Sequence, residues 1–150
     1  MYKNPKPTID IAATDGKRVI LVKRGRDPFK GSWVLPGGFI EYGETVEDAA
    51  RREMLEETGI QVELIDVLGV YSDPSRDPRG HQISIVFVGR PLSSELNAGD
   101  DAEDAMWRDL DSMKPGDLAF DHDQVVSDLK RWLKSQGTYW SKKSREKSND

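Results

Sequence analysis

Three glutamates near the end of one predicted helix have a spacing that suits metal binding. Glu53, Glu56 and Glu57 are three and four residues apart, which places their side chains on one face of an α-helix. Val46 and Ala49 fall on that same face, so it changes from apolar to acidic along the helix. Like charges at this spacing repel, and carboxylates turned inward lose hydration. The face is therefore unfavourable unless cations bind to it.

The chemistry of this cluster indicates which cation would bind. Clustered carboxylates that leave room for water suit hard divalent cations, Mg²⁺ or Mn²⁺, better than Zn²⁺. A solvated acidic surface is the alternative for an arbitrary run of this kind. The shared apolar face and the preceding turn, Pro36-Gly37-Gly38, favour the metal site. Two glycines allow positive φ values and close approach of the backbone to a ligand, although a tight turn without a ligand explains them equally well.

The helix that carries the glutamates has clear end signals. Thr45 is a good N-cap with Asp48 three residues later, a capping-box arrangement, and Gly59 is a typical C-terminal stop. We therefore predict a helix over residues 46–58. Arg52 lies within it and offsets one of the negative charges, but not three.

Composition excludes several classes of function. At 150 residues the chain fits one domain, and a net charge of −5 gives no general attraction for nucleic acid or anionic membranes. The absence of cysteine excludes disulfides, thiolate catalysis and zinc–thiolate sites. No apolar run approaches the length of a membrane span, and the first ten residues lack a signal-peptide core. We expect a cytoplasmic protein that binds neither nucleic acid nor membrane.

Strand signals fill the first half of the chain and its middle. Residues 8–13 and 19–23 read as two strands joined by a hairpin-type turn. Residues 61–71 and 81–89 read as a long hairpin around an exposed loop at residues 72–80. The stretch 81–89 is the richest in β-branched residues, which predicts a central strand.

The last third of the chain predicts a short strand and a second helix. The strand begins at Met106, and the helix has Asp121 as its N-cap, with Gln124 three residues later, and ends at Gly137. We expect a single domain at residues 1–137 and a charged, disordered tail at residues 138–150. Strands mixed with two helices, without regular alternation, predict an α/β fold with a mixed sheet flanked by helices.

The stretch around the glutamates resembles the Nudix box. The matching positions are Gly38, Glu44, Arg52, Glu53, Met54, Glu56, Glu57, Gly59 and Ile60. Such a match arises by chance in on the order of 10⁻⁷ chains of this length. The resemblance implies an α/β/α sandwich around a mixed sheet. It also implies Mg²⁺-dependent hydrolysis, with Mn²⁺ substituting, of the diphosphate in a small nucleotide substrate.

The resemblance also assigns roles to residues of this chain. Glu53, Glu56 and Glu57 would be metal ligands, with the Gly37 carbonyl as a further ligand. Arg52 would orient the glutamates by ion pairing. Glu44 would support the junction between loop and helix. A general base in the loop at residues 91–104 is implied by several subfamilies, with Asp101 first and Glu103 second among the candidates, which are Glu95, Asp100, Asp101, Glu103 and Asp104.

The nature of the substrate is less sharply indicated. Residues 35–44 look like the corresponding sequence in small ADP-ribose pyrophosphatases, which includes the start of the Nudix box. Those enzymes also tend to carry a proline about fifteen residues after the box, and Pro74 lies fifteen residues after Gly59. The resemblance therefore favours cleavage of ADP-ribose into AMP and ribose 5-phosphate. A pyrophosphohydrolase of nucleoside triphosphates or dinucleoside polyphosphates is the alternative. A non-catalytic nucleotide sensor is less favoured, since such domains usually lose carboxylates of the box.

Basic residues near the box are candidates for substrate binding. Arg24 and Arg26 just precede the glycine turn and are expected to contact phosphate, with solvated surface as the alternative. The loop that carries Pro74 and Arg79 is a candidate for contacting the terminal ribose or the adenine. Family members often form homodimers, and the sequence leaves both a monomer and a homodimer open.

Overall fold

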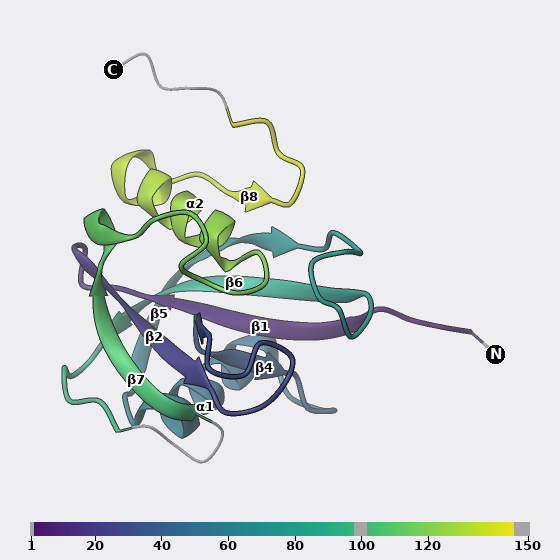
Figure 1. The fold of residues 1–150 in the computed structure, drawn as a ribbon, viewed down its shortest axis with the longest axis horizontal. Coiled ribbons are helices and arrows are strands. Elements are labelled where there is room, and N and C mark those ends of the chain that lie inside the picture. Colours follow the sequence, from purple (N-terminus) through teal and green to yellow (C-terminus); the bar gives the residue numbers. More distant parts are fainter. Residues whose placement is uncertain (1, 98–101, 146–150) are drawn as a thin grey trace.

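The structure, a computed structural model, describes residues 2–97 and 102–145. Figure 1 shows helices α1 and α2 on opposite sides of the strands. In chain order the elements are β1 (Lys6–Ala13), β2 (Arg18–Arg24), β3 (Trp33–Val34), β4 (Gly37–Phe39), α1 (Val46–Thr58), β5 (Val62–Tyr71), β6 (Gln82–Pro91), β7 (Ala102–Asp109), the 3₁₀ turn η1 (Leu110–Ser112), α2 (His122–Ser135) and β8 (Tyr139–Trp140).

The strands form two sheets. The larger has the order β4-β1-β6-β5-β8, and the smaller has the order β3-β2-β7. Strands β1 and β6 pair in parallel, whereas β5 and β6 form the predicted long antiparallel hairpin. Strand β6 lies in the middle of the larger sheet, as its β-branched composition predicted. The predicted α/β fold with a mixed sheet flanked by helices is confirmed.

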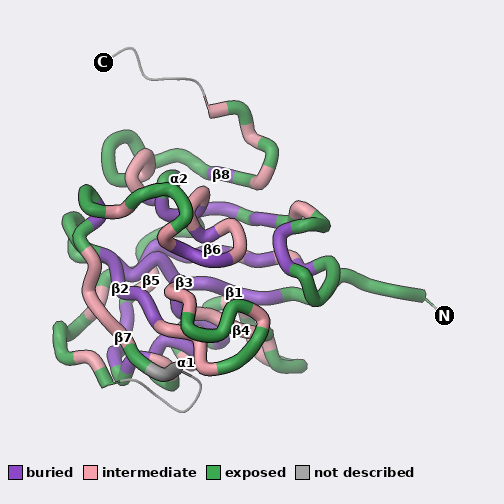
Figure 2. Tube along the Cα trace, viewed as in Figure 1, coloured by how far each residue is buried: buried purple, intermediate pink, exposed green. Residues whose placement is uncertain are grey.

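Strand β1 divides its side chains between the two helix layers. Ile9 and Ile11 join the buried cluster that packs against α1, whereas Ala12 joins the cluster on the side of α2. This alternation follows from the two-residue period of a strand. The central strands are accordingly buried along most of their length (Figure 2). Asp10, between Ile9 and Ile11, therefore points toward the start of α2.

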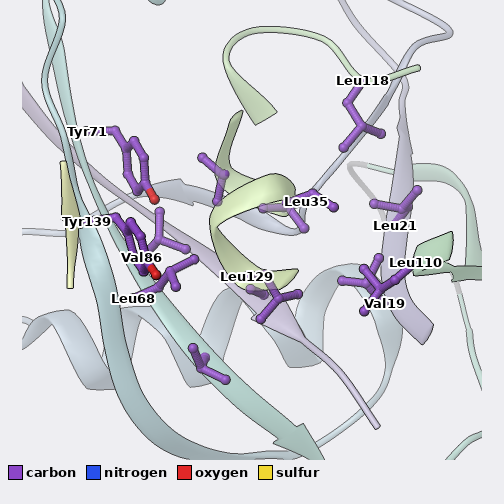
Figure 3. Packing of buried hydrophobic residues seen from close by; sticks show 14 residues of the cluster. Val19, Leu21, Leu35, Leu68, Tyr71, Val86, Leu110, Leu118, Leu129 and Tyr139 are labelled. Atoms are coloured by element: carbon purple, nitrogen blue, oxygen red, sulfur yellow. The ribbon is translucent and has the colours of Figure 1, made fainter. Parts of the chain in front are cut away.

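The larger buried cluster joins α2 to both sheets and reaches the glycine turn. Figure 3 shows Leu129 of α2 among Leu68, Val86 and Leu35, and all four side chains are buried. Leu35 lies two residues before Gly37. Its burial fixes the chain just before β4, which is the strand that faces the glutamates.

Helix α1 has the predicted bounds and end structures. The Asp48 backbone N–H donates to the Thr45 hydroxyl at 3.1 Å, and Gly59 adopts a left-handed conformation with φ of 73°. The prediction of a helix over residues 46–58 is confirmed. Within residues 2–97 and 102–145, neither helix is long and apolar enough to cross a membrane.

The predicted hairpin between the first two strands is wrong. The turn itself forms, since the Thr14 hydroxyl accepts the Gly16 N–H and donates to the Arg18 carbonyl. Beyond one bridge between Thr14 and Val19, however, β1 and β2 diverge into different sheets. Strand β1 pairs with β4 and β6, and β2 pairs with β3 and β7.

Three predictions for the last third of the chain also need correction. Strand β7 begins at Ala102, because its acidic start pairs with β2 and places Asp104 opposite Lys23. Asp121 precedes α2 but makes no side-chain cap, because its carboxylate binds Arg76. The tail expected from residue 138 is structured over residues 138–145, where β8 pairs with β5.

Candidate active site

A cavity of about 390 Å³ opens between α1, the glycine turn and the start of α2. One wall is acidic and comes from α1. The other wall is basic and aromatic, with arginines from the end of β2, the residues after it and the loop between β5 and β6, and with Phe39 of β4 and Phe120 before α2. The lining residues with charged or aromatic side chains are Asp10, Lys23, Arg24, Arg26, Phe39, Glu41, Arg52, Glu53, Glu56, Glu57, Arg76, Asp77, Arg79, Phe120 and His122.

All three predicted glutamates line the acidic wall, at different depths. Glu53 is buried with 9% of its surface exposed, Glu57 is half-buried, and Glu56 is exposed. The helix that positions them also buries Ala49, Ala50 and Met54 against the sheet. Packing of these apolar residues thus forces the acidic turn toward the cavity.

Arg52 joins the glutamates to one another and to the loop before the helix. Its guanidinium donates to both carboxylate oxygens of Glu44, at 2.7 and 2.9 Å. Nη1 also donates to Glu53 at 2.9 Å and to Glu56 at 3.3 Å, and Nη2 donates to the Phe39 carbonyl. Arg52 thus forms ion pairs with two of the three glutamates, and Glu44 connects the loop to the helix through Arg52.

Glu44 is held in its ionised form by this arrangement. The hydrogen bond from Arg52, followed by one involving the Glu41 backbone, lowers the pKa of Glu44 to about 2. The same contacts raise the pKa of Arg52. The pair therefore stays charged at neutral pH and links the turn after β4 to α1.

The two glycines of the turn serve close packing within the protein. Neither uses the positive φ that glycine allows. A Cβ at Gly37 would lie 2.2 Å from Asp10 Oδ1, and a Cβ at Gly38 would lie 2.6 Å from Glu53 Oε1. The Gly37 backbone N–H donates to Glu57 at 2.9 Å. Gly37 requires glycine, because a Cβ there would also lie 2.2 Å from the Ile9 carbonyl oxygen, whereas a Cβ at Gly38 would meet only the carboxylate of Glu53.

The chemistry of the acidic wall fits a hard divalent cation. Three carboxylates supply oxygen donors on one side of a cavity, as Mg²⁺ and Mn²⁺ prefer. In the described part of the chain, no three acidic or imidazole side chains are already gathered around one point. Glu53 instead accepts from Arg52, and Glu57 accepts from the Gly37 N–H.

Two arginines of the basic wall lie beside one phenylalanine ring. The guanidinium of Arg24 lies 5.1 Å from the centre of the Phe120 ring, and that of Arg79 lies 5.9 Å from the same ring. Arg79 is also held by Asp77, to which Nη2 donates at 2.8 Å, and it lies 5.5 Å from the Phe39 ring. Two positive charges therefore line the same cavity as the acidic helix.

The basic wall favours a bound anion. Burial, and next the charge of Arg79, lower the pKa of Arg24. Arg26 also lines the cavity, although it is exposed. An anionic group between these side chains would relieve the repulsion between them.

A buried polar network at the bottom of the cavity was not predicted from the sequence. The Leu35 N–H donates to His122 Nδ1 at 3.0 Å, and His122 Nε2 lies 3.7 Å from Asp10 Oδ2. The Ser84 hydroxyl donates to the same Asp10 oxygen. Burial raises the pKa of Asp10 and lowers the pKa of His122. Because Nδ1 accepts a hydrogen bond, His122 is neutral with its proton on Nε2.

His122 makes the stability of the protein depend on pH. Below about pH 6.5 the unfolded chain binds a proton at His122 that the folded protein excludes, so the free energy of unfolding falls as pH falls. The slope is at most about 1.4 kcal/mol per pH unit. Urea unfolding at pH 7.5 and 5.5 measures it. Asp10, whose pKa is raised, contributes with the opposite sign.

A pair of asparagine variants isolates the histidine. His122→Asn keeps an acceptor for the Leu35 N–H but cannot titrate, so it should lose part of the pH dependence. His81→Asn is the matched control, because His81 is exposed and is the other histidine of the chain. An equal loss of pH dependence in both variants would contradict the assignment.

The loop after β5 is less exposed than predicted, and it turns different residues toward the cavity. Arg76 and Asp77 are buried, and Arg76 donates twice to Asp121, at 2.9 and 2.7 Å. Pro74 is exposed and does not line the cavity, and its role in contacting the substrate stays a prediction. It lies in a turn at Asp73, whose Oδ1 accepts from the Ser75 backbone and hydroxyl.

The candidates for the general base are only partly placed. Glu95 and Asp104 are exposed and do not line the cavity. Asp100 and Asp101 lie outside the described residues, as does the side chain of Glu103. The choice of Asp101 stays a prediction.

Comparison with known proteins agrees with the Nudix box found in the sequence. The NUDIX domain family matches residues 4–129. The chain belongs to the Nudix family. The membership predicted from residues 38–60 is therefore confirmed.

Individual Nudix proteins are similar to this chain over most of its length. An ADP-ribose pyrophosphatase from Methanocaldococcus jannaschii is 48% identical over 132 residues, which cover 88% of this chain and 77% of that protein. The NUDIX domain of Shewanella oneidensis NrtR, in a cocrystal with ADP ribose, has a TM-score of 0.78 at 29% identity. The match covers 88% of this chain and 90% of the NrtR chain.

A third similar structure contains a metal ion. It is a bifunctional NMN adenylyltransferase/ADP ribose pyrophosphatase from Francisella tularensis, complexed with AMP and a manganese ion. Its TM-score is 0.77 at 32% identity, over 91% of this chain and 43% of that chain.

Proposed function

We propose that this Nudix protein hydrolyses ADP-ribose to AMP and ribose 5-phosphate. The observation that carries the proposal is a single cavity lined both by carboxylates on α1 and by arginines around Phe120. A diphosphate between a nucleoside and a sugar matches both walls. The 48% identity to an ADP-ribose pyrophosphatase supports this choice of substrate.

The reaction adds water across the diphosphate. A water oxygen forms a bond to one phosphorus, the bond from that phosphorus to the bridging oxygen breaks, and the two monophosphates leave. Arg24 and Arg79 hold the negative charge of the diphosphate, which is spread over its oxygens as the bond breaks. Glu53, Glu56 and Glu57 line the same space. Arg52 orients the carboxylates of Glu53 and Glu56, and the Gly37 N–H donates to that of Glu57.

We propose Mg²⁺ as the cation at the acidic wall, with Mn²⁺ able to substitute. Glu53, Glu56 and Glu57 would hold it, with the Gly37 carbonyl as a further ligand. A cation bound there supplies charge neutralisation of the diphosphate and a lowered pKa for the attacking water. Asp101 remains our first candidate for the base that accepts the proton of that water.

The basic and aromatic wall would decide which nucleotide is cut. Phe120 and Phe39 offer ring faces beside the two arginines, which suits a base or ribose next to a diphosphate. Arg26 at the rim is placed to meet a phosphate. A ligand sensor without turnover is the second function, but the chain keeps all three glutamates that such domains usually lose.

A substrate panel tests the specificity. With Mg²⁺, we expect kcat/KM for ADP-ribose to exceed that for nucleoside triphosphates, dinucleoside polyphosphates and nucleotide sugars by at least about tenfold, which corresponds to about 1.4 kcal/mol. Separation of substrate and products by chromatography, with each product quantified over time, measures the rates. Preference for a triphosphate or a dinucleoside polyphosphate would refute the assignment, and binding of ADP-ribose without turnover would indicate the sensor.

A further inference from the structure

The last segment that the structure describes contacts the base of the loop that borders the cavity. We call residues 139–145 the C-terminal segment and residues 72–80 the cavity loop. The Ser141 hydroxyl accepts hydrogen bonds from the backbone N–H groups of Ser72 at 2.9 Å and Asp73 at 3.1 Å. The Ser141 carbonyl accepts from the Gln124 side chain at 3.0 Å. One residue thus joins the first two residues of the cavity loop to α2.

Strand β8 lays the C-terminal segment along the end of β5. Gly69 pairs with Tyr139 and Val70 pairs with Trp140, in parallel. Tyr139 is buried in the same cluster as Tyr71 and Leu68, close to the point where the cavity loop begins (Figure 3). A Cβ at Gly69 would lie 2.1 Å from the Tyr139 carbonyl oxygen, so this approach requires a glycine in β5.

A buried carboxylate locks the other end of the segment. Asp128 of α2 is fully buried and accepts from Arg145 through Nε and Nη2, each at 2.7 Å. The same carboxylate accepts from the Tyr71 hydroxyl at 2.8 Å and from Arg131 at 3.1 Å. Bidentate arginine pairs of this kind are the strong ones among charged hydrogen bonds. Asp128 therefore ties together the C-terminal segment, α2 and the last residue of β5.

Hydrogen bonds within the cavity loop connect its first residues to the residues that line the cavity. The Asp73 carbonyl accepts from the Arg76 N–H at 3.1 Å. Arg76 then binds Asp121 at the start of α2, and Asp77 holds Arg79 beside the aromatic rings. The Nudix family match ends at residue 129, so the C-terminal segment lies beyond the part that matches the family.

We propose that the C-terminal segment fixes the cavity loop in place and thereby sets the affinity of the enzyme for its substrate. Ser141 is the positioning residue, since it acts on Arg76 and Arg79 through the backbone of residues 72–73. The effect on substrate affinity rests on the proposed function, whereas the effect on the loop does not.

Ser141→Ala tests both effects. Hydrogen exchange of the free protein should become faster at residues 72–77, since two backbone N–H groups lose their acceptor. KM for ADP-ribose should rise by about 3- to 10-fold while kcat stays within about twofold. Ser141→Thr keeps the hydroxyl and should restore both values. Ser144→Ala, an exposed serine of the same segment, is the matched control and should change neither.

Two further variants each remove one of the arginines that pair with Asp128. Arg145→Met frees the C-terminal segment and should speed exchange at residues 72–77. Arg131→Met leaves the segment attached and should not, since Arg131 and Asp128 lie on the same helix. Equal exchange or equal KM in Ser141→Ala and wild type would overturn the proposal. Failure of the proposed function would differ, as the wild type itself would not hydrolyse ADP-ribose.

Discussion

Replacing Glu57 with glutamine is expected to lower kcat for ADP-ribose hydrolysis by about 10³-fold while the protein stays folded. The carboxylate lines the acidic wall, and its loss removes several kcal/mol of stabilisation that a bound cation gives the transition state. Glutamine keeps an oxygen that can accept the Gly37 N–H, so the contact between α1 and β4 survives. Steady-state kinetics and thermal unfolding measure the two effects.

Glu47→Gln is the matched control for this variant. Glu47 lies in the first turn of the same helix, is exposed, and does not line the cavity. Its replacement should leave kcat unchanged and cost at most about 0.3–1 kcal/mol through the helix dipole. If Glu57→Gln kept kcat within about threefold of wild type, the metal role of Glu57 would be refuted.

Arg52→Lys is expected to lower kcat/KM by about 10- to 100-fold, the usual cost of losing a residue that orients metal ligands. Lysine keeps the charge but lacks the planar fork that reaches Glu44 and Glu53 at the same time. The free energy of unfolding should fall by about 1–2 kcal/mol, because Arg52 is only partly exposed. Kinetics over a range of Mg²⁺ concentrations should show weaker activation by the metal.

The neighbouring Arg51 provides a control with the same substitution. Arg51 is exposed and pairs with Asp48 at 3.3 Å on the outer face of α1. Arg51→Lys should match wild type in kcat/KM and in stability within about 0.5 kcal/mol. Similar kinetic losses in both variants would show that Arg52 has no special orienting role.

Features specified by neighbours in the sequence could be predicted well. The limits of α1 followed from Thr45 and Gly59, because caps act over a few residues. The contacts of Arg52 with Glu53 and Glu56 were implied by the resemblance to the Nudix box, and Glu56 lies four residues after Arg52, at the spacing of helix neighbours. In each case the interacting groups lie on one helix or at its ends, so the local pattern contains the geometry.

Features that depend on distant partners could not be predicted in this way. The turn at Gly16 formed as expected, but β1 pairs with β6, which lies about 75 residues further along the chain. The acidic start of β7 becomes a strand only because β2 offers it a partner. Tyr139 and Arg145 looked like parts of a disordered tail, yet their contacts lie on β5 and α2.

The same limit applies to the site. Asp10, Arg76 and His122 come from three separate elements, so no spacing along the chain connects them. A charge at Asp10, in the middle of a buried strand, was the one signal that could have drawn attention to it. The distance of Pro74 from the box likewise says nothing about the direction in which its loop turns.

Identification of the products formed from ADP-ribose tests the central claim most directly. Purified protein is incubated with ADP-ribose and Mg²⁺, and the products are separated and identified by mass, with chelated and Glu57→Gln samples alongside. We predict equal amounts of AMP and ribose 5-phosphate from the wild type, and almost none after chelation or from the variant. Intact ADP-ribose, other products, or the same yield from Glu57→Gln would contradict the account.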